Sequence, residues 1–139
     1  LERACSTLAA ARRKAAHLGT MRAEITHQAD PGLSDEAFCA SDVAFHRALV
    51  DGACNPVLSY QLAGAVEAMQ PLMNMITFTA RSRVEIISLH TRIADAIEAG
   101  DGAEADRALE ALSRYTMGLA AQVMARRATP GKINDSSQR

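Results

Sequence analysis

The sequence predicts an all-α protein, an antiparallel bundle of helices, and three observations support this fold class. Alanine, the residue with the highest helix propensity, occurs 28 times among the 139 residues. Aromatic residues make up only 4% of the chain and tryptophan is absent, which is not typical of a β-sheet core. Apolar residues recur with the 3.6-residue period of an amphipathic helix in most segments. A chain of 14.8 kDa has the size of one domain.

Two helices are expected before the first strong turn signal. The first covers residues 1–17, where apolar residues form one stripe, and Gly19 ends it. Thr20 has the side chain of an N-cap, so the second helix covers 21–29. The turn sequence Asp-Pro-Gly follows at 30–32.

The middle of the chain predicts two longer helices. Ser34 or Asp35 opens the third helix, which runs to about Gly52. A proline in the first helical turn then starts the fourth helix, over 56–80. Pro71 lies inside this segment and should kink or interrupt it, because proline lacks the N–H that a helix interior needs.

Two helices and a polar tail complete the chain. The fifth helix covers 84–99 and ends at a glycine. Asp101, with a glutamate three residues later, has the pattern of a capping box and opens the sixth helix, which runs to about residue 127. Residues 1–128 are therefore expected to form one helical domain. The tail 129–139 has few apolar residues, and we expect it to be disordered.

Charge and cysteine content restrict the classes of function. Fifteen basic and sixteen acidic residues give a net charge of −1, so a strongly basic nucleic-acid-binding surface is not indicated. No apolar run approaches the roughly 18 residues that a membrane span needs. Cys5, Cys39 and Cys54 are odd in number and lack C-x-x-C spacing, which favours reduced thiols in a cytoplasmic protein over disulfides or a cysteine zinc site.

Three residues are candidate metal ligands. Asp42 and His46 are four residues apart in a predicted helix, so both side chains lie on one face about one turn apart. His90 lies on another predicted helix and can supply a third donor. Carboxylate and imidazole donors suit a divalent metal ion. A pair with this spacing is more often a surface or capping contact, and a lone histidine is usually a core or boundary residue, so the spacing alone leaves both interpretations open.

Polar residues around the kinked fourth helix are candidates for binding a ligand. They include Asn74, Arg81 and Arg83, and arginine can make two hydrogen bonds to one carboxylate. The sequence contains no G-x-S-x-G, P-loop or H-E-x-x-H motif, so it does not predict an enzyme of those classes.

Four segments together resemble a known regulatory module. Residues 42–49 read D-V-A-F-H-R-A-L, and 55–58 read N-P-V-L. Residues 90–101 read H-T-R-I-A-D-A-I-E-A-G-D, and the chain opens with L-E followed by L-A-A at 8–10. In order and spacing they are similar to the FCD domain, the C-terminal effector-binding domain of FadR-type regulators in the GntR family. The resemblance covers about residues 1–128.

The resemblance implies an architecture and a role. FCD domains are antiparallel bundles of six or seven helices around a small-molecule cavity, and they form homodimers. An N-terminal winged helix-turn-helix, which we expect to be absent from this chain, binds operator DNA. The effector is commonly a small organic acid or a sugar acid.

The resemblance also assigns a metal site. Many members hold zinc or nickel with one aspartate and three histidines, and the matching positions here are Asp42, His46 and His90. The usual last histidine falls at Leu112, which cannot ligate a metal. Tyr115, one turn further along, is a candidate to approach the site and to bind the effector.

We therefore expect a ligand-sensing, dimerising domain of a transcriptional regulator rather than an enzyme. Two alternatives remain. A purely structural dimerisation bundle would have its interior filled by side chains, with no cavity beside Asp42. A metal-dependent enzyme would use an open coordination position to activate water.

Overall fold

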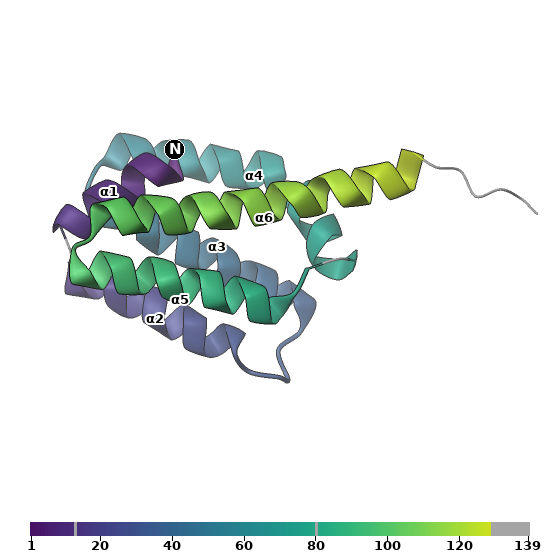
Figure 1. The fold of residues 1–139 in the computed structure, drawn as a ribbon, viewed down its shortest axis with the longest axis horizontal. Coiled ribbons are helices and arrows are strands. Elements are labelled where there is room, and N and C mark those ends of the chain that lie inside the picture. Colours follow the sequence, from purple (N-terminus) through teal and green to yellow (C-terminus); the bar gives the residue numbers. More distant parts are fainter. Residues whose placement is uncertain (13, 80, 129–139) are drawn as a thin grey trace, which may run out of the picture.

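The computed structural model describes residues 1–12, 14–79 and 81–128, which hold six α-helices and no strand (Figure 1). The helices are α1 (Glu2–Arg12), α2 (Ala15–Gln28), α3 (Asp35–Gly52), α4 (Pro56–Thr79), α5 (Arg83–Ala99) and α6 (Gly102–Ala128). The predicted all-α bundle is confirmed. The tail expected to be disordered, 129–139, lies outside the described residues.

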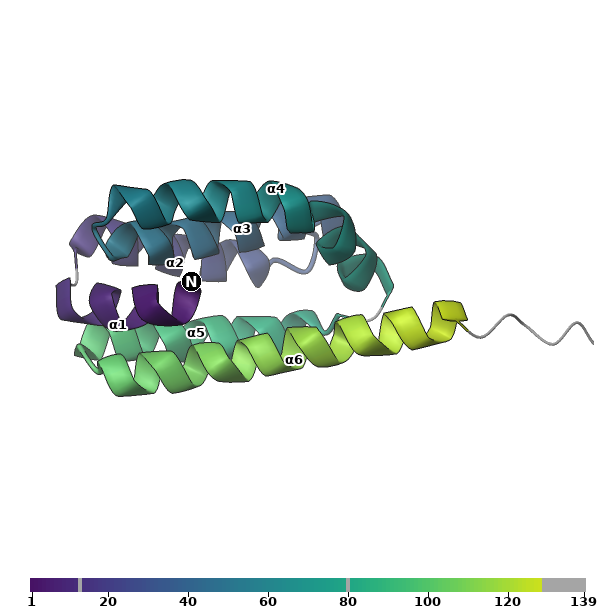
Figure 2. The same cartoon turned by 90° about the horizontal axis from the view of Figure 1, so that it is seen from above.

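Successive helices run in alternating directions, so the bundle is antiparallel (Figure 1). Helix α3 packs against α1, α2 and α4, while α6 packs against α1 and α5. Seen from above, the C-terminal part of α6 extends beyond the other helices (Figure 2). Helices α3 and α6 each pack against both α1 and α4.

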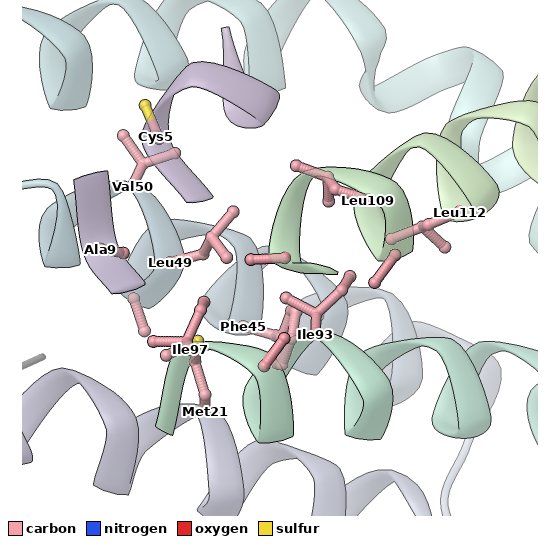
Figure 3. Close-up of a cluster of buried hydrophobic side chains, with 14 of the residues drawn as sticks. Cys5, Ala9, Met21, Phe45, Leu49, Val50, Ile93, Ile97, Leu109 and Leu112 are labelled. Atoms are coloured by element: carbon pink, nitrogen blue, oxygen red, sulfur yellow. The ribbon is translucent and has the colours of Figure 1, made fainter. Parts of the chain in front are cut away.

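The core consists of aliphatic and aromatic side chains from all six helices (Figure 3). Phe38 and Phe45 are its two fully buried aromatic residues among the described positions, and both lie on α3. Leu49, Ile93 and Leu109 are also fully buried and come from α3, α5 and α6. Burial of side chains this size contributes about 1.5–3 kcal/mol each, which makes this cluster the main source of stability.

Side-chain caps define three of the helix starts. Ser34, Ser82 and Asp101 each accept a hydrogen bond from the backbone N–H three residues later, at 3.1, 3.3 and 2.9 Å. These bonds satisfy N–H groups that have no partner within the helix. Gly100 ends α5 with φ at 74°, a conformation that glycine adopts without strain. The predicted starts at Ser34 and Asp101 are therefore confirmed.

The predicted boundary between the first two helices was wrong. Helix α1 ends at Arg12 and α2 begins at Ala15, so Gly19 and Thr20 both lie inside α2. Lys14 has extended backbone angles and no side-chain cap, and the chain reverses there. Packing accounts for this turn, because α1 packs against α6 as well as α3 and α5, whereas α2 packs against α3 and α5.

Helix α4 is continuous across Pro71, and its last turns bend toward α5 (Figure 2). The expected kink is present without interrupting the helix, since proline removes one backbone hydrogen bond and crowds the preceding turn. Glu67 is the one charged residue in this helix. Although α4 is long and has a single charge, neither it nor any other helix within the described ranges is both long and apolar enough to span a membrane.

Candidate metal centre and ligand cavity

Two helices bring one carboxylate and two imidazoles together. Asp42 and His46 lie one turn apart on α3, and His90 faces them from α5. Asp42 Oδ1 lies 3.3 Å from His90 Nε2 and 3.9 Å from His46 Nε2. One donor atom from each of the three residues lies within 4.8 Å of the others. The side chains of Asp42 and His46 on α3 and of His90 on α5 therefore meet at one place.

Packing fixes the orientation of the two imidazoles. The ring of His90 is fully buried and stacks on Phe45, with centroids 3.9 Å apart and planes 14° from parallel. The His46 ring meets the same phenylalanine edge-on at 5.6 Å. Because Phe45 is itself fully buried, neither ring can rotate without disturbing the core.

The donor set fits a divalent metal ion. His90 Nε2 is buried without a hydrogen-bond partner among the described residues, although it faces the Asp42 carboxylate. A buried polar atom left in this way costs free energy, which coordination of a cation would recover. One carboxylate oxygen and two imidazole nitrogens suit zinc or nickel, and a three-donor site leaves a position for a ligand.

The opposite nitrogen of each ring faces a side-chain oxygen from another helix. His90 Nδ1 is hydrogen-bonded to Gln28 Oε1 of α2 at 2.8 Å. His46 Nδ1 lies 2.6 Å from Glu2 Oε1 of α1, and the two groups form an ion pair. Sequence reasoning missed both partners; for Glu2, the L-E pair at the start of the chain was the available signal.

A buried arginine also contacts the carboxylate. Arg81 Nη2 lies 2.7 Å from Asp42 Oδ1, and only 3% of the arginine side chain is exposed. Its guanidinium stands 5.3 Å from the centre of the Phe38 ring, in the position of a cation–π contact. Burial raises the pKa of Asp42, but the two histidines and Arg81 have the larger effect. The net pKa lies below its usual value, so this carboxylate is ionised.

The two histidines have opposite electrostatic environments. Burial lowers the pKa of His46, but the carboxylates of Glu2 and Asp42 outweigh it and raise the pKa from 6.5 to about 9. For His90, burial has the larger effect and the pKa falls below 6.5, although Asp42 opposes the change. At neutral pH in the metal-free protein, His46 is therefore a cation and His90 is neutral.

A cavity of about 390 Å³ opens beside the cluster, between α1, α3, α4 and α6. Its polar lining comprises Glu2, Asp42, His46, Gln70, Arg81, Ser113 and Thr116. Most of its remaining wall is aliphatic or thioether side chains: Leu1, Val43, Leu62, Ala65, Val66, Met69, Met73, Leu112 and Met117. His90 lies outside this lining, so a ligand would reach the cluster through Asp42 and His46. Cavities of about this size are typical of small-molecule sites.

The sequence matches the profile of the FCD domain over residues 1–114. The chain belongs to the FCD family. FCD domains are the effector-binding domains of GntR-type regulators and are regulatory rather than catalytic. Comparison with curated proteins returned no match.

Of the four residues proposed to bind an effector, Arg81 alone borders the cavity of this FCD domain. Asn74 accepts a hydrogen bond from Gln70 Nε2 at 2.8 Å and lines a neighbouring depression that shares Gln70 with the cavity. Arg83 donates to the carbonyl of Leu33 and to Asp35. The hydroxyl of Tyr115 accepts from the backbone N–H of residue 82. None of the latter three side chains lines the cavity, although Asn74 is bonded to Gln70, which does.

Leu112 occupies the position where the resemblance places a fourth ligand. Its side chain is buried and lines the same cavity as Asp42 and His46. A side chain projecting from this position of α6 therefore reaches the cavity, but leucine offers no donor atom. The FCD cluster consists of three protein donors among the described residues.

Proposed function

We propose that this FCD domain senses a small carboxylate through a divalent metal ion, zinc or nickel, held by Asp42, His46 and His90. The observation that carries the proposal is the position of the cluster beside a cavity of about 390 Å³. A purely structural bundle would have this space filled by side chains, so the cavity favours a sensor.

The metal, Arg81 and the buried aromatic residues would each have a different role in recognising the acid. When bound, the metal supplies a cation that a carboxylate can ligate. Arg81 borders the cavity and already contacts Asp42, so its guanidinium can turn to a second carboxylate with little movement. The buried aromatic residues behind the cluster exclude water and strengthen both attractions.

The lining of the cavity favours an acid with an apolar body. A sugar acid needs a hydrogen-bond partner for each hydroxyl, and outside the charged cluster the lining offers chiefly Gln70, Ser113 and Thr116. The thioethers of Met69 and Met73, by contrast, adapt to an aliphatic or aromatic chain. Both classes belong in a screen, and we expect the acid with an apolar chain to bind more tightly.

The bound acid would act on DNA through other parts of a regulator. In the proposed protein, two copies of this domain form a homodimer, and a winged helix-turn-helix domain that precedes it binds operator DNA in the cytoplasm. An acid that binds one conformation of the bundle better shifts the population toward it. A coupling of roughly 1–3 kcal/mol would change operator affinity about 5- to 150-fold.

A thermal-shift screen tests the proposal. Carboxylates and sugar acids are added to the protein as purified, after chelation, and after zinc or nickel is restored. An acid at about 100 times its Kd should stabilise the fold by roughly 2.7 kcal/mol and raise the melting temperature. A shift that disappears on chelation and returns with metal supports the proposal. A shift that survives chelation contradicts the role of the metal, and the absence of any shift contradicts the sensor.

A further inference from the structure

The two candidate histidine ligands share one arrangement. In each ring Nε2 faces Asp42, and in each ring Nδ1 faces the side-chain oxygen of a residue on a different helix. For His90 that oxygen belongs to Gln28, and for His46 it belongs to Glu2. Two acceptors from α1 and α2 thus lie behind two histidines from α5 and α3.

Gln28 stands out because its burial is unfavourable by itself. Its side chain is 1% exposed, and its Nε2 has no hydrogen-bond partner among the described residues. An apolar side chain of the same length would fill the space without leaving buried N–H groups unsatisfied. Gln28 makes one side-chain hydrogen bond within the described ranges, in which Oε1 accepts the proton of His90 Nδ1. Stability of the core does not account for glutamine at this position, but control of the histidine does.

The chemistry of imidazole shows what the acceptor achieves. A neutral imidazole carries one proton, and an acceptor at Nδ1 places that proton on Nδ1. The lone pair then lies on Nε2, which is the nitrogen that faces Asp42 in both rings. His46, a cation without metal, gains this lone pair when it releases its Nε2 proton to bind the ion. Hydrogen bonds of this kind also fix the plane of the ring, and they raise its basicity toward a metal.

We propose that Gln28 and Glu2 are positioning residues that hold His90 and His46 with their Nε2 lone pairs directed at one shared metal ion. This inference rests on the proposed metal site. The two acceptors differ in charge: Gln28 contributes a neutral carbonyl in the core, whereas Glu2 contributes a carboxylate at the cavity wall. The site accordingly gains a second negative charge on the side of His46 alone.

Substitution of Gln28 gives the sharpest test. Gln28→Met keeps the length of the side chain and removes the acceptor, whereas Gln28→Glu keeps an oxygen at the same place. Gln122→Met, on the exposed face of α6, is the matched control. The affinity for zinc is measured by competition with a chromophoric chelator. The unfolding free energy is measured with chelator present, and the ring tautomer of His90 by ¹⁵N NMR of the metal-free protein.

The expected outcome separates positioning from a structural role. Gln28→Met should lower zinc affinity about 10- to 100-fold without loss of stability, and Gln28→Glu should restore it. Asp42 competes for the proton of His90 at Nε2, so the metal-free wild type should hold a larger share of His90 with its proton on Nδ1 than Gln28→Met does. Wild-type zinc affinity in Gln28→Met, or equal losses in both variants together with lower stability, would overturn the proposal.

The NMR measurement keeps this inference distinct from the proposed function. If the wild type binds no zinc or nickel, the proposed function fails, and the tautomer of His90 still decides whether Gln28 positions it. Glu2→Leu and Glu2→Gln repeat the test at His46. Glu2→Leu, which removes the acceptor, should lower zinc affinity about 10- to 100-fold. Glu2→Gln, which keeps an amide oxygen there, should recover part of that affinity.

Discussion

The ion pair between Glu2 and His46 should make the stability of the metal-free protein depend on pH. The pKa of His46 is 6.5 in an unfolded chain and about 9 in the fold, and its side chain is only 16% exposed. At about 1.4 kcal/mol per pKa unit, protonation of His46 contributes about 3 kcal/mol to the unfolding free energy. Because the folded pKa is the higher one, this contribution is complete below pH 6.5 and is lost as pH rises through 9.

The assay is chemical denaturation with chelator present, at intervals between pH 6 and 9.5. The wild type is compared with Glu2→Gln, which removes the largest cause of the raised pKa, and with Glu67→Gln, which removes an exposed charge on α4. We expect the wild type and Glu67→Gln to lose about 3 kcal/mol over this window and Glu2→Gln to lose clearly less. Equal slopes in all three proteins would refute the assignment of His46 as a cation held by Glu2.

Substitutions at four other positions test the fold and the site. Phe45→Ala removes a fully buried ring that stacks on a candidate ligand, and denaturation should show a loss of about 3–5 kcal/mol; a loss below about 1 kcal/mol would contradict this packing. Gly100→Ala strains a residue with φ at 74° and should cost about 1 kcal/mol, whereas Gly118→Ala, with open space around it inside α6, should stabilise by a similar amount. Leu112→His should raise zinc affinity by adding a fourth donor, and Leu112→Met should not; equal affinities would place this position out of reach of the metal.

Local signals in the sequence predicted most of the fold. The caps at Ser34 and Asp101 depend on bonds to residues three positions away, so the sequence contains all the information needed. The boundary at Lys14 has no such signal, because the residues around it are good helix formers and the turn is fixed by packing against distant helices. The end of the first helix was predicted at Gly19 because glycine often ends helices, but glycine inside a helix is tolerated at a modest cost.

The candidate site could be predicted only in part, for the same reason. Asp42 and His46 are neighbours on one helix face, and His90 was a candidate on another helix that the resemblance to FCD domains also assigned. Their partners Glu2 and Gln28 reach them from other helices, and Gln28 is 62 residues from His90 along the chain. No periodicity within a helix indicates such pairs.

The polar residues near the kinked helix illustrate the same limit. Arg81 and Arg83 are two positions apart, and the sequence gives them equal standing as ligand-binding residues. The structure directs Arg81 to Asp42 beside the cavity and Arg83 to the loop before α3. Their direction depends on the turn between α4 and α5, which a count of residues does not specify.

Calorimetric titration of zinc into chelated protein tests the central claim most directly. The account predicts that the wild type binds about one ion per chain, because one cluster of three donors is present within the described ranges. Asp42→Asn keeps the shape of the side chain and removes its charge, so it should abolish tight binding while circular dichroism shows an intact helical fold. Absence of binding in the wild type, or equal binding in the variant, would contradict a metal centre at Asp42, His46 and His90.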